Sequence, residues 1–452
     1  MKCLGYLIFF LYIFLPIMTY GSPARLLIIF SGEELGNLEP CGCFEGQIGG
    51  ISRRHTFINS IMHTEEDIVF PVSLGDLIRD YRRQEEIKME ILYRAMEETG
   101  FILHNLGEKD IEIGPQLLSY LSQISNIPFL SSNIKITDSL PISVNQYILK
   151  KCFNGKHSYT IAFLGIISQS LFKNYIPEYV SIDNPVQTLR PLIKDLRERS
   201  DLIVLLSHAT QEESLEIAKS FPEIGLIITG HGIDDPENSI EYVGNTAIVS
   251  AGKEGKYIGV VKYFLHSKAL ERKSIEIFPL DSRIKDSQKM TLLLKEYQHI
   301  VRDEDLLSKA PQASLPNELS YVGNAVCGLC HKTIYDHWSK TGHGASYNTL
   351  VSTGHQHDPE CIRCHTTGYG YISGFLNYEK SRSLINVGCE SCHGAGSNHI
   401  KNVSDTSYGL VDENACKECH DIQHSPKFQF NEFWKKIKHP EEVITNLREI
   451  TE

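Results

Sequence analysis

Four copies of one short cysteine–histidine pattern constrain this chain of 452 residues more than any other feature. Each copy has two cysteines separated by two residues, and a histidine directly follows the second cysteine. The copies occupy residues 327–331, 361–365, 389–393 and 416–420. So short a stretch cannot bury a conventional apolar core around each copy. We therefore expect whatever the cysteines hold to form much of the interior of this region.

The repeated pattern is the attachment signature of c-type haem. Two thiols bond to the haem vinyl groups, and the adjacent histidine then lies beneath the iron as an axial ligand. A zinc or disulfide scaffold could also use eight thiols, but zinc does not require a histidine after every second cysteine. We predict four haem c groups. The attachment residues are Cys327, Cys330, Cys361, Cys364, Cys389, Cys392, Cys416 and Cys419, and the proximal ligands are His331, His365, His393 and His420.

The candidates for the second axial ligand of each haem iron can be reduced by elimination. All six methionines precede the motifs, the last being Met290, so methionine ligation from this chain is excluded there. Because His–Met ligation raises the potential, we expect low-potential haems. The histidines that remain after residue 320 are His337, His343, His355, His357, His399, His424 and His439. Their spacing does not reveal which of them bind iron.

The residues between the motifs resemble the cytochrome c-552/c-554 family of tetrahaem cytochromes. The matching segments are the stretch from Cys327 to His343, C-I-R-C-H-T-T-G-Y and V-G-C-E-S-C-H-G-A-G-S-N-H. The resemblance implies a mainly helical, loop-rich domain that exchanges electrons with periplasmic redox donor and acceptor proteins. It also implies distal ligands at His343, at His399 and at His424 or His439. One haem in such cytochromes can lack a sixth protein ligand.

The N-terminus has the pattern of a secretory signal peptide. An apolar run from Leu4 to Met18 follows Lys2, and Thr19 and Gly21 are small enough for cleavage after Gly21. An uncleaved membrane anchor is the alternative, and both interpretations export the rest of the chain. We expect no later membrane span. The formal charge of −12 argues against a nucleic-acid-binding protein.

Short apolar runs alternate with amphipathic segments after the signal peptide. The runs at 25–30, 68–73, 159–165, 201–207 and 225–229 predict buried strands, and 84–99 and 186–199 predict helices. This alternation predicts an α/β layered domain. We assign residues 1–21 to the signal peptide, 22–280 to the α/β domain, 281–320 to a helix and linker, 321–440 to the haem domain and 441–452 to a C-terminal tail.

Three metal-binding side chains come directly after predicted strands. They are Asp76, His208 and His231, and Cys41 and Cys43 follow the first strand. Because the carboxyl ends of such strands gather at one edge of a sheet, these side chains are candidates for one divalent-metal site.

In this order, these residues resemble the calcineurin-like metallophosphoesterases of the 5′-nucleotidase branch. Further matches are L-G-N-L-E-P near the start, S-S-N-I at 131–134 and G-K-Y-I-G-V at 255–260. The resemblance implies a four-layer α/β/β/α sandwich. Three motifs depart from the family: its Asp-x-His appears as residues 33–35 (EEL), its Gly-Asn-His-Glu as 105–108 (NLGE) and its Gly-His-x-His as 230–233 (HGI after Gly230). The losses fall mainly on one of the family's two metals.

The Cys41-Gly-Cys43 sequence has three open interpretations. The thiolates could complete the metal site, form a redox-active dithiol, or form a structural disulfide, for which Cys152 is one candidate partner. Three functions are likewise open for the whole chain. They are an electron carrier, a haem-linked oxidoreductase acting on a small molecule, and a metal-dependent phosphoesterase with an attached cytochrome. Whether the protein is an enzyme stays undecided, and the first function is favoured.

Overall fold

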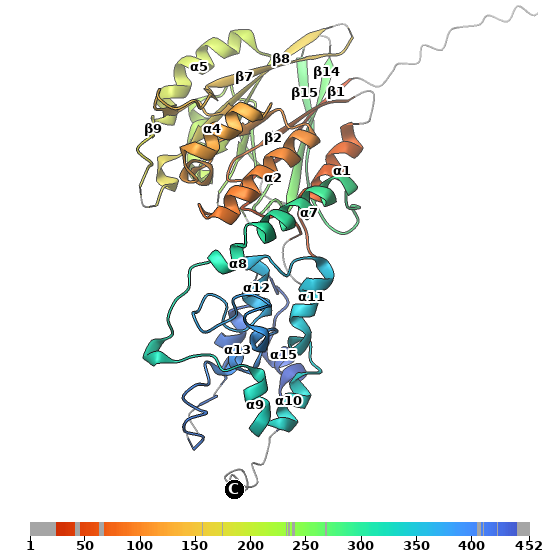
Figure 1. Ribbon diagram of the computed structural model, residues 1–452. Coiled ribbons are helices and arrows are strands. Elements are labelled where there is room, and N and C mark those ends of the chain that lie inside the picture. Colours follow the sequence, from red (N-terminus) through yellow and green to blue (C-terminus); the bar gives the residue numbers. More distant parts are fainter. Residues whose placement is uncertain are drawn as a thin grey trace, which may run out of the picture.

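The computed structural model describes residues 24–440 apart from 41–45, 63–66, 156, 174, 232, 234–235, 237–239, 267–268, 405–407, 410 and 423. An α/β sandwich occupies the N-terminal part, and a region of short helices and loops follows it (Figure 1). The predicted signal peptide, Cys41, Cys43 and the C-terminal tail lie outside the described residues. Within the described ranges no helix has the length and apolarity needed to cross a bilayer.

The first sheet has seven strands in the order β15-β14-β1-β2-β3-β4-β6. The five strands from β1 to β6 run parallel, and β14 and β15 pair antiparallel at one edge. The bounds are β1 (Arg25–Ser31), β2 (Asp67–Ser73), β3 (Leu103–Asn105), β4 (Phe129–Leu130), β6 (Val144–Asn145), β14 (Tyr257–His266) and β15 (Ala269–Pro279).

The second sheet has six strands in the order β12-β13-β11-β10-β8-β7. Its central strands β8, β10, β11 and β13 are parallel. The bounds are β7 (Tyr147–Phe153), β8 (Ser158–Ile167), β10 (Leu202–His208), β11 (Leu226–Thr229), β12 (Glu241–Val243) and β13 (Thr246–Val249). A separate two-stranded ribbon pairs β5 (Ile134–Ile136) with β9 (Val180–Ile182).

Alternation along the strands produces four layers. In β1, Leu26 and Ile28 pack between the two sheets, whereas Leu27 and Ile29 face helices on the outer side. Helices α1 (Ile51–Met62), α2 (Arg83–Thr99), α4 (Pro115–Ile124) and α7 (Gln288–Asp303) cover the first sheet, and α5 (Pro185–Arg199) and α6 (Gln211–Ser220) cover the second. The predicted α/β/β/α sandwich is confirmed.

The C-terminal region is helical with long loops. Its helices are α9 (Asn324–Cys330), α10 (Lys332–Trp338), α11 (Ser346–Thr353), α12 (Pro359–His365), α13 (Cys389–His393), α14 (Glu413–Lys417) and α15 (Phe430–Ile437), and α8 (Leu306–Lys309) leads into them from α7. A single small cluster of buried apolar side chains lies among the described residues of this region: Leu307, Tyr347, Leu350, Ile362, Phe375 and Leu384. So small a cluster agrees with an interior that the haem groups would complete.

Candidate functional sites

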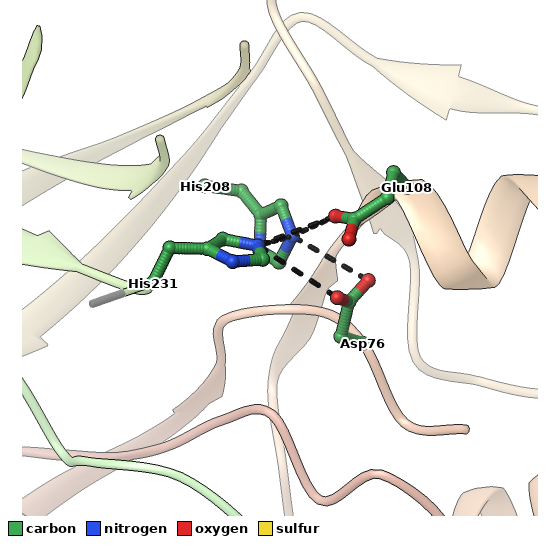
Figure 2. Close-up of side chains that lie close together, drawn as sticks. All are labelled: Asp76, Glu108, His208 and His231. Carbon is green, nitrogen blue, oxygen red and sulfur yellow. Dashed lines mark hydrogen bonds and ion pairs between the residues drawn. The ribbon is translucent and has the colours of Figure 1, made fainter. Parts of the chain in front are cut away.

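Four side chains from the two sheets meet at the carboxyl ends of the parallel strands (Figure 2). Asp76 follows β2, and Glu108 opens α3 (Glu108–Glu112) after β3. His208 is the last residue of β10, and His231 follows β11. Each sheet thus contributes two side chains to one cluster, because the two sheets pack face to face and the carboxyl ends of these strands lie at the same end of the sandwich.

The ligand atoms of this carboxylate–histidine cluster converge. One atom from each of the four side chains lies within 4.8 Å of all the others. His208 Nε2 lies 2.7 Å from Glu108 Oε2 and 3.4 Å from Asp76 Oδ1. His231 Nε2 lies 3.3 Å from Glu108 Oε2 and 2.9 Å from His208 Nε2. Asp76, Glu108 and His208 are buried, and His231 is partly exposed.

The backbone around the cluster is strained. Asp76 and His231 have φ values of 53° and 50°, in the left-handed region that residues other than glycine rarely adopt. Glu33 has a φ of 50°, and its buried carboxylate accepts a hydrogen bond from the backbone N–H of His231. Such conformations cost about 1–3 kcal/mol each and concentrate at functional sites. The strain supports a functional role for this edge of the sandwich.

Opposing charges inside the cluster shift its pKa values. Burial raises the pKa of Asp76 to about 7, although His208 acts in the opposite direction. Burial acts to lower the pKa of His208, but the carboxylates of Asp76 and Glu108 outweigh it and hold that pKa well above its usual range. Burial also acts to raise the pKa of Glu108, and hydrogen bonds from His208 and His231 hold it below its usual range instead. The carboxylates of Asp76 and Glu108 therefore favour the charged form of His208.

Asp110 fixes the backbone that carries the cluster. Its carboxylate accepts hydrogen bonds from the backbone N–H groups of Asp76 at 2.8 Å and Gly107 at 2.9 Å. Gly107 stands where the family motif has its histidine. A side chain there would collide with Asp76 and come within 2.7 Å of His208 Cε1, so the cluster as built excludes a histidine at this position.

The donor set fits one divalent cation. Imidazole nitrogens and carboxylate oxygens suit Mn²⁺, Fe²⁺ and Zn²⁺. The convergence of two histidine nitrogens and two carboxylates on one point is the arrangement that such an ion requires. A second metal has few donors left, because Leu35, Leu106 and Ile233 stand at the histidine of the first family motif, the asparagine of the second and the last histidine of the third.

The predicted metal candidates have different outcomes. The structure brings Asp76, His208 and His231 together, whereas Cys41 and Cys43 lie outside the described residues. Cys152 is a buried free thiol in β7, packed between the sheets, so the structure contains no disulfide at this residue. Sequence reasoning missed Glu108 and Glu33. The signal was present, since Glu108 is the one residue of the Gly-Asn-His-Glu motif that the chain retains.

The four C-x-x-C-H motifs lie on or beside short helices. They fall on α9, α12, α13 and α14 with their following residues, and none of these eight cysteines, all of them described, forms a disulfide. The Cys327 thiol lies within hydrogen-bonding reach of Cys389, and the Cys364 thiol within reach of Cys419. The first motif therefore neighbours the third, and the second neighbours the fourth.

Three of the proximal histidines face a second histidine ring. The ring centroids lie 6.4 Å apart for His331 and His399, 6.1 Å apart for His420 and His343, and 6.1 Å apart for His393 and His439. Bonds from imidazole to a metal are about 2 Å long, so two imidazoles on opposite sides of one metal have centroids about 6 Å apart. The three pairs fit an iron between each.

The second motif differs from the other three. His365 Nδ1 lies 2.8 Å from the carbonyl oxygen of Ser346, a contact that directs its other nitrogen away from the backbone. Within the described ranges no second imidazole faces His365 at a comparable distance. The remaining distal candidate, His424, has Nδ1 2.8 Å from the carboxylate of Asp421.

Known proteins resemble each half of the chain. Residues 326–394 match the model of the family described as cytochrome c554 and c-prime. Cytochrome c-554 of Nitrosomonas europaea is 29% identical over 100 residues, which cover 19% of this chain and 43% of that protein. The uncharacterized metallophosphoesterase YunD of Bacillus subtilis is 26% identical over 213 residues, which cover 45% of this chain and 43% of that protein. The chain thus spans less than half the length of these relatives.

A solved structure shares the N-terminal fold. The 5′-nucleotidase precursor of Thermus thermophilus superposes with a TM-score of 0.53 at 14% identity, covering 80% of this chain and 72% of that one. Identity this low shows the fold alone. The C-terminal part of the chain therefore matches the cytochrome c-554 family, and the N-terminal part has the fold of the calcineurin-like metallophosphoesterases and 5′-nucleotidases.

Proposed function

We propose that the protein is an exported tetrahaem c-type cytochrome that carries electrons between redox donor and acceptor proteins of the periplasm. The observation that carries the proposal is the set of three histidine pairs, each spaced for two axial ligands of one iron and each built on a C-x-x-C-H motif. Bound haem would supply one-electron redox chemistry. Export is supported by the signal-like N-terminus and by haem attachment, which takes place outside the cytoplasm.

The chain's own residues attach and orient the groups. The paired cysteines fix each haem, and a backbone carbonyl orients the proximal ring in at least two motifs. Those contacts are His365 to Ser346 and His393 to Gly409, at 2.8 and 2.7 Å. Such partners fix the ring orientation of a ligating histidine and raise its basicity. They support a count of four, because the carbonyl contact is present in the second motif although no second imidazole among the described residues faces His365.

A haem-linked oxidoreductase is the second candidate function, and one observation favours it. His365 faces no second imidazole among the described residues, so its iron would have room for a small molecule. The carboxylate–histidine cluster of Asp76, Glu108, His208 and His231 would bind one divalent cation in either function. Phosphoester hydrolysis has less support, because the two-metal clamp of such enzymes needs donors that this chain has lost.

The proposal is tested by the haem content of the full exported chain. A pyridine haemochrome assay should give four haem c groups per chain, and replacing both cysteines of any one motif by serine should remove one. The matched control is Cys152→Ser, which alters a buried thiol outside the motifs and should leave the count unchanged. Fewer than four haems in the wild-type protein would overturn the tetrahaem proposal, and recovery of the protein only in the cytoplasm would overturn export.

A further inference from the structure

The N-terminal domain contacts the helix that carries the second haem motif. Asp358 caps this helix, α12, by accepting a hydrogen bond from the backbone N–H of Glu360. The Asp358 carboxylate is buried and also accepts hydrogen bonds from Gln84 of α2 at 2.8 Å and Tyr297 of α7 at 3.1 Å. The start of α12 is therefore fixed by side chains of the α/β domain.

Lys88 of α2 brings a buried positive charge to the same place. Its Nζ lies 2.8 Å from Glu85 of its own helix and 2.7 Å from Glu360 of α12. The Lys88 side chain is only 4% exposed. Glu360 is adjacent to Cys361, the first attachment cysteine of the second motif. The ion pair that joins the two domains therefore includes a residue directly next to a haem-attachment cysteine.

Lys88 is charged in this position. Burial acts to lower its pKa, but the carboxylates of Glu360, Glu85 and Asp358 outweigh that effect and hold the pKa above its usual range. A buried ion pair seldom stabilises a fold more than apolar side chains of the same volume would. Stability alone is therefore a weak reason for a charge at this site.

We propose that Lys88 is a positioning residue that sets the reduction potential of the haem on the second motif. The α/β domain would then act as an electrostatic part of the cytochrome. This inference rests on the proposed tetrahaem function and goes beyond it, because it gives the domain with the phosphoesterase fold a role in electron transfer.

The sign of the effect follows from charge. An oxidised haem carries one more positive charge than a reduced haem, so a nearby cation favours reduction and a nearby carboxylate favours oxidation. These interactions are strong where water is excluded. Arg82 also faces Glu360, but its side chain is 65% exposed, and water screens its charge. Loss of Lys88 should therefore lower the potential, and loss of the Glu360 charge should raise it.

The test is a potentiometric titration of the full-length haem-loaded protein, followed optically and by electron paramagnetic resonance. Lys88→Met should lower one of the four midpoint potentials, with about a tenfold change in the ratio of oxidised to reduced haem, or about 59 mV for one electron. Lys88→Arg should restore it, and Glu360→Gln should move the same potential upward. Loss of that signal in a Cys361→Ser, Cys364→Ser variant assigns it to the second motif.

Lys289→Met is the matched control, because Lys289 is an exposed lysine of α7 paired with Glu98 of the same domain. It should leave all four potentials unchanged. The inference is overturned if no potential moves, if all four move together, or if Lys88→Met and Glu360→Gln shift the potential in the same direction. If Lys88→Met does not fold, Glu360→Gln provides the test instead. The Glu360 side chain is 45% exposed, so its replacement should leave the fold intact. Four haems with unmoved potentials would refute this inference alone, whereas fewer than four would refute the proposed function.

Discussion

The two regions of the molecule fill their interiors with different material. In the α/β sandwich, side chains such as Phe163 and Leu206 are fully buried between continuous sheets. In the cysteine-rich region, one small apolar cluster lies among the described residues, and most of the attachment cysteines and proximal histidines are only partly buried. One region therefore folds around its own side chains, whereas the other is arranged around groups that it must acquire.

The largest effect should follow from preventing haem attachment. In a host without the attachment machinery, residues 321–440 should lose their fold, because their own core is too small, and the sandwich should persist. Limited proteolysis with mass spectrometry should then show cleavage confined to the C-terminal region. Equal resistance of both regions would show that the C-terminal region folds without haem.

Truncation of a core side chain in the sandwich should destabilise the sandwich and leave the haem region intact. Phe163→Ala removes a fully buried ring between the sheets and should destabilise the sandwich by about 3–5 kcal/mol. The haem absorption spectrum should remain, since the motifs lie elsewhere. Phe153→Ala is the control, because that ring is 60% exposed, and it should change the unfolding free energy by less than about 0.5 kcal/mol. Thermal unfolding monitored by far-UV and Soret bands separates the two regions.

A divalent cation should stabilise the sandwich and have no effect on the stability of the haem region. At a concentration one hundred times its dissociation constant, Mn²⁺ should add about 2.7 kcal/mol to the free energy of unfolding. Glu108→Ala should abolish this gain because it removes a ligand, whereas Glu112→Ala on the same helix should keep it. Unfolding curves with and without Mn²⁺ provide the measurement. An unchanged gain in Glu108→Ala would show that the ion binds elsewhere.

Much of the sandwich was predictable from the sequence because β1, β2, β8, β10 and β11 are apolar runs between polar turns. The edge strands β7 and β15 were not predicted, because charged residues interrupt their apolar side chains. The short strands β3, β4 and β6 were missed, since two or three residues carry no periodicity. Asp76, His208 and His231 were found because each follows such a strand. Glu108 was missed because it lies in a motif that had lost its other family residues.

The haem region was predictable only through its motifs. Cysteine spacing identifies attachment sites, but the pairing of His399 with His331 and of His439 with His393 depends on how loops fold back. The contact between Lys88 and Glu360 joins residues far apart in the chain. No local pattern in the sequence encodes it.

The smallest effect concerns pH at the contact between the two regions. A hydrogen bond with Glu39 holds the pKa of His355 above its usual value of 6.5. The contact is therefore fully present below pH 6.5 and is lost as the pH rises through the raised pKa. Amide protection of residues 353–360, measured relative to the intrinsic exchange rate at each pH, should fall at high pH, and Glu39→Gln should flatten this dependence. Glu271→Gln, which alters the exposed pair with His266, should not. A profile unchanged by Glu39→Gln would assign the dependence to another group.

We propose that paired histidines hold the haem irons of the C-terminal region. Electron paramagnetic resonance of the oxidised full-length protein tests it most directly, with the spins counted against total haem. The account predicts low-spin signals from at least three irons per chain, one for each of the pairs His331–His399, His343–His420 and His393–His439. The spin state of the fourth iron would distinguish the two candidate functions. A low-spin iron supports the electron carrier, and a high-spin iron supports the oxidoreductase. Fewer than three low-spin irons would contradict the account.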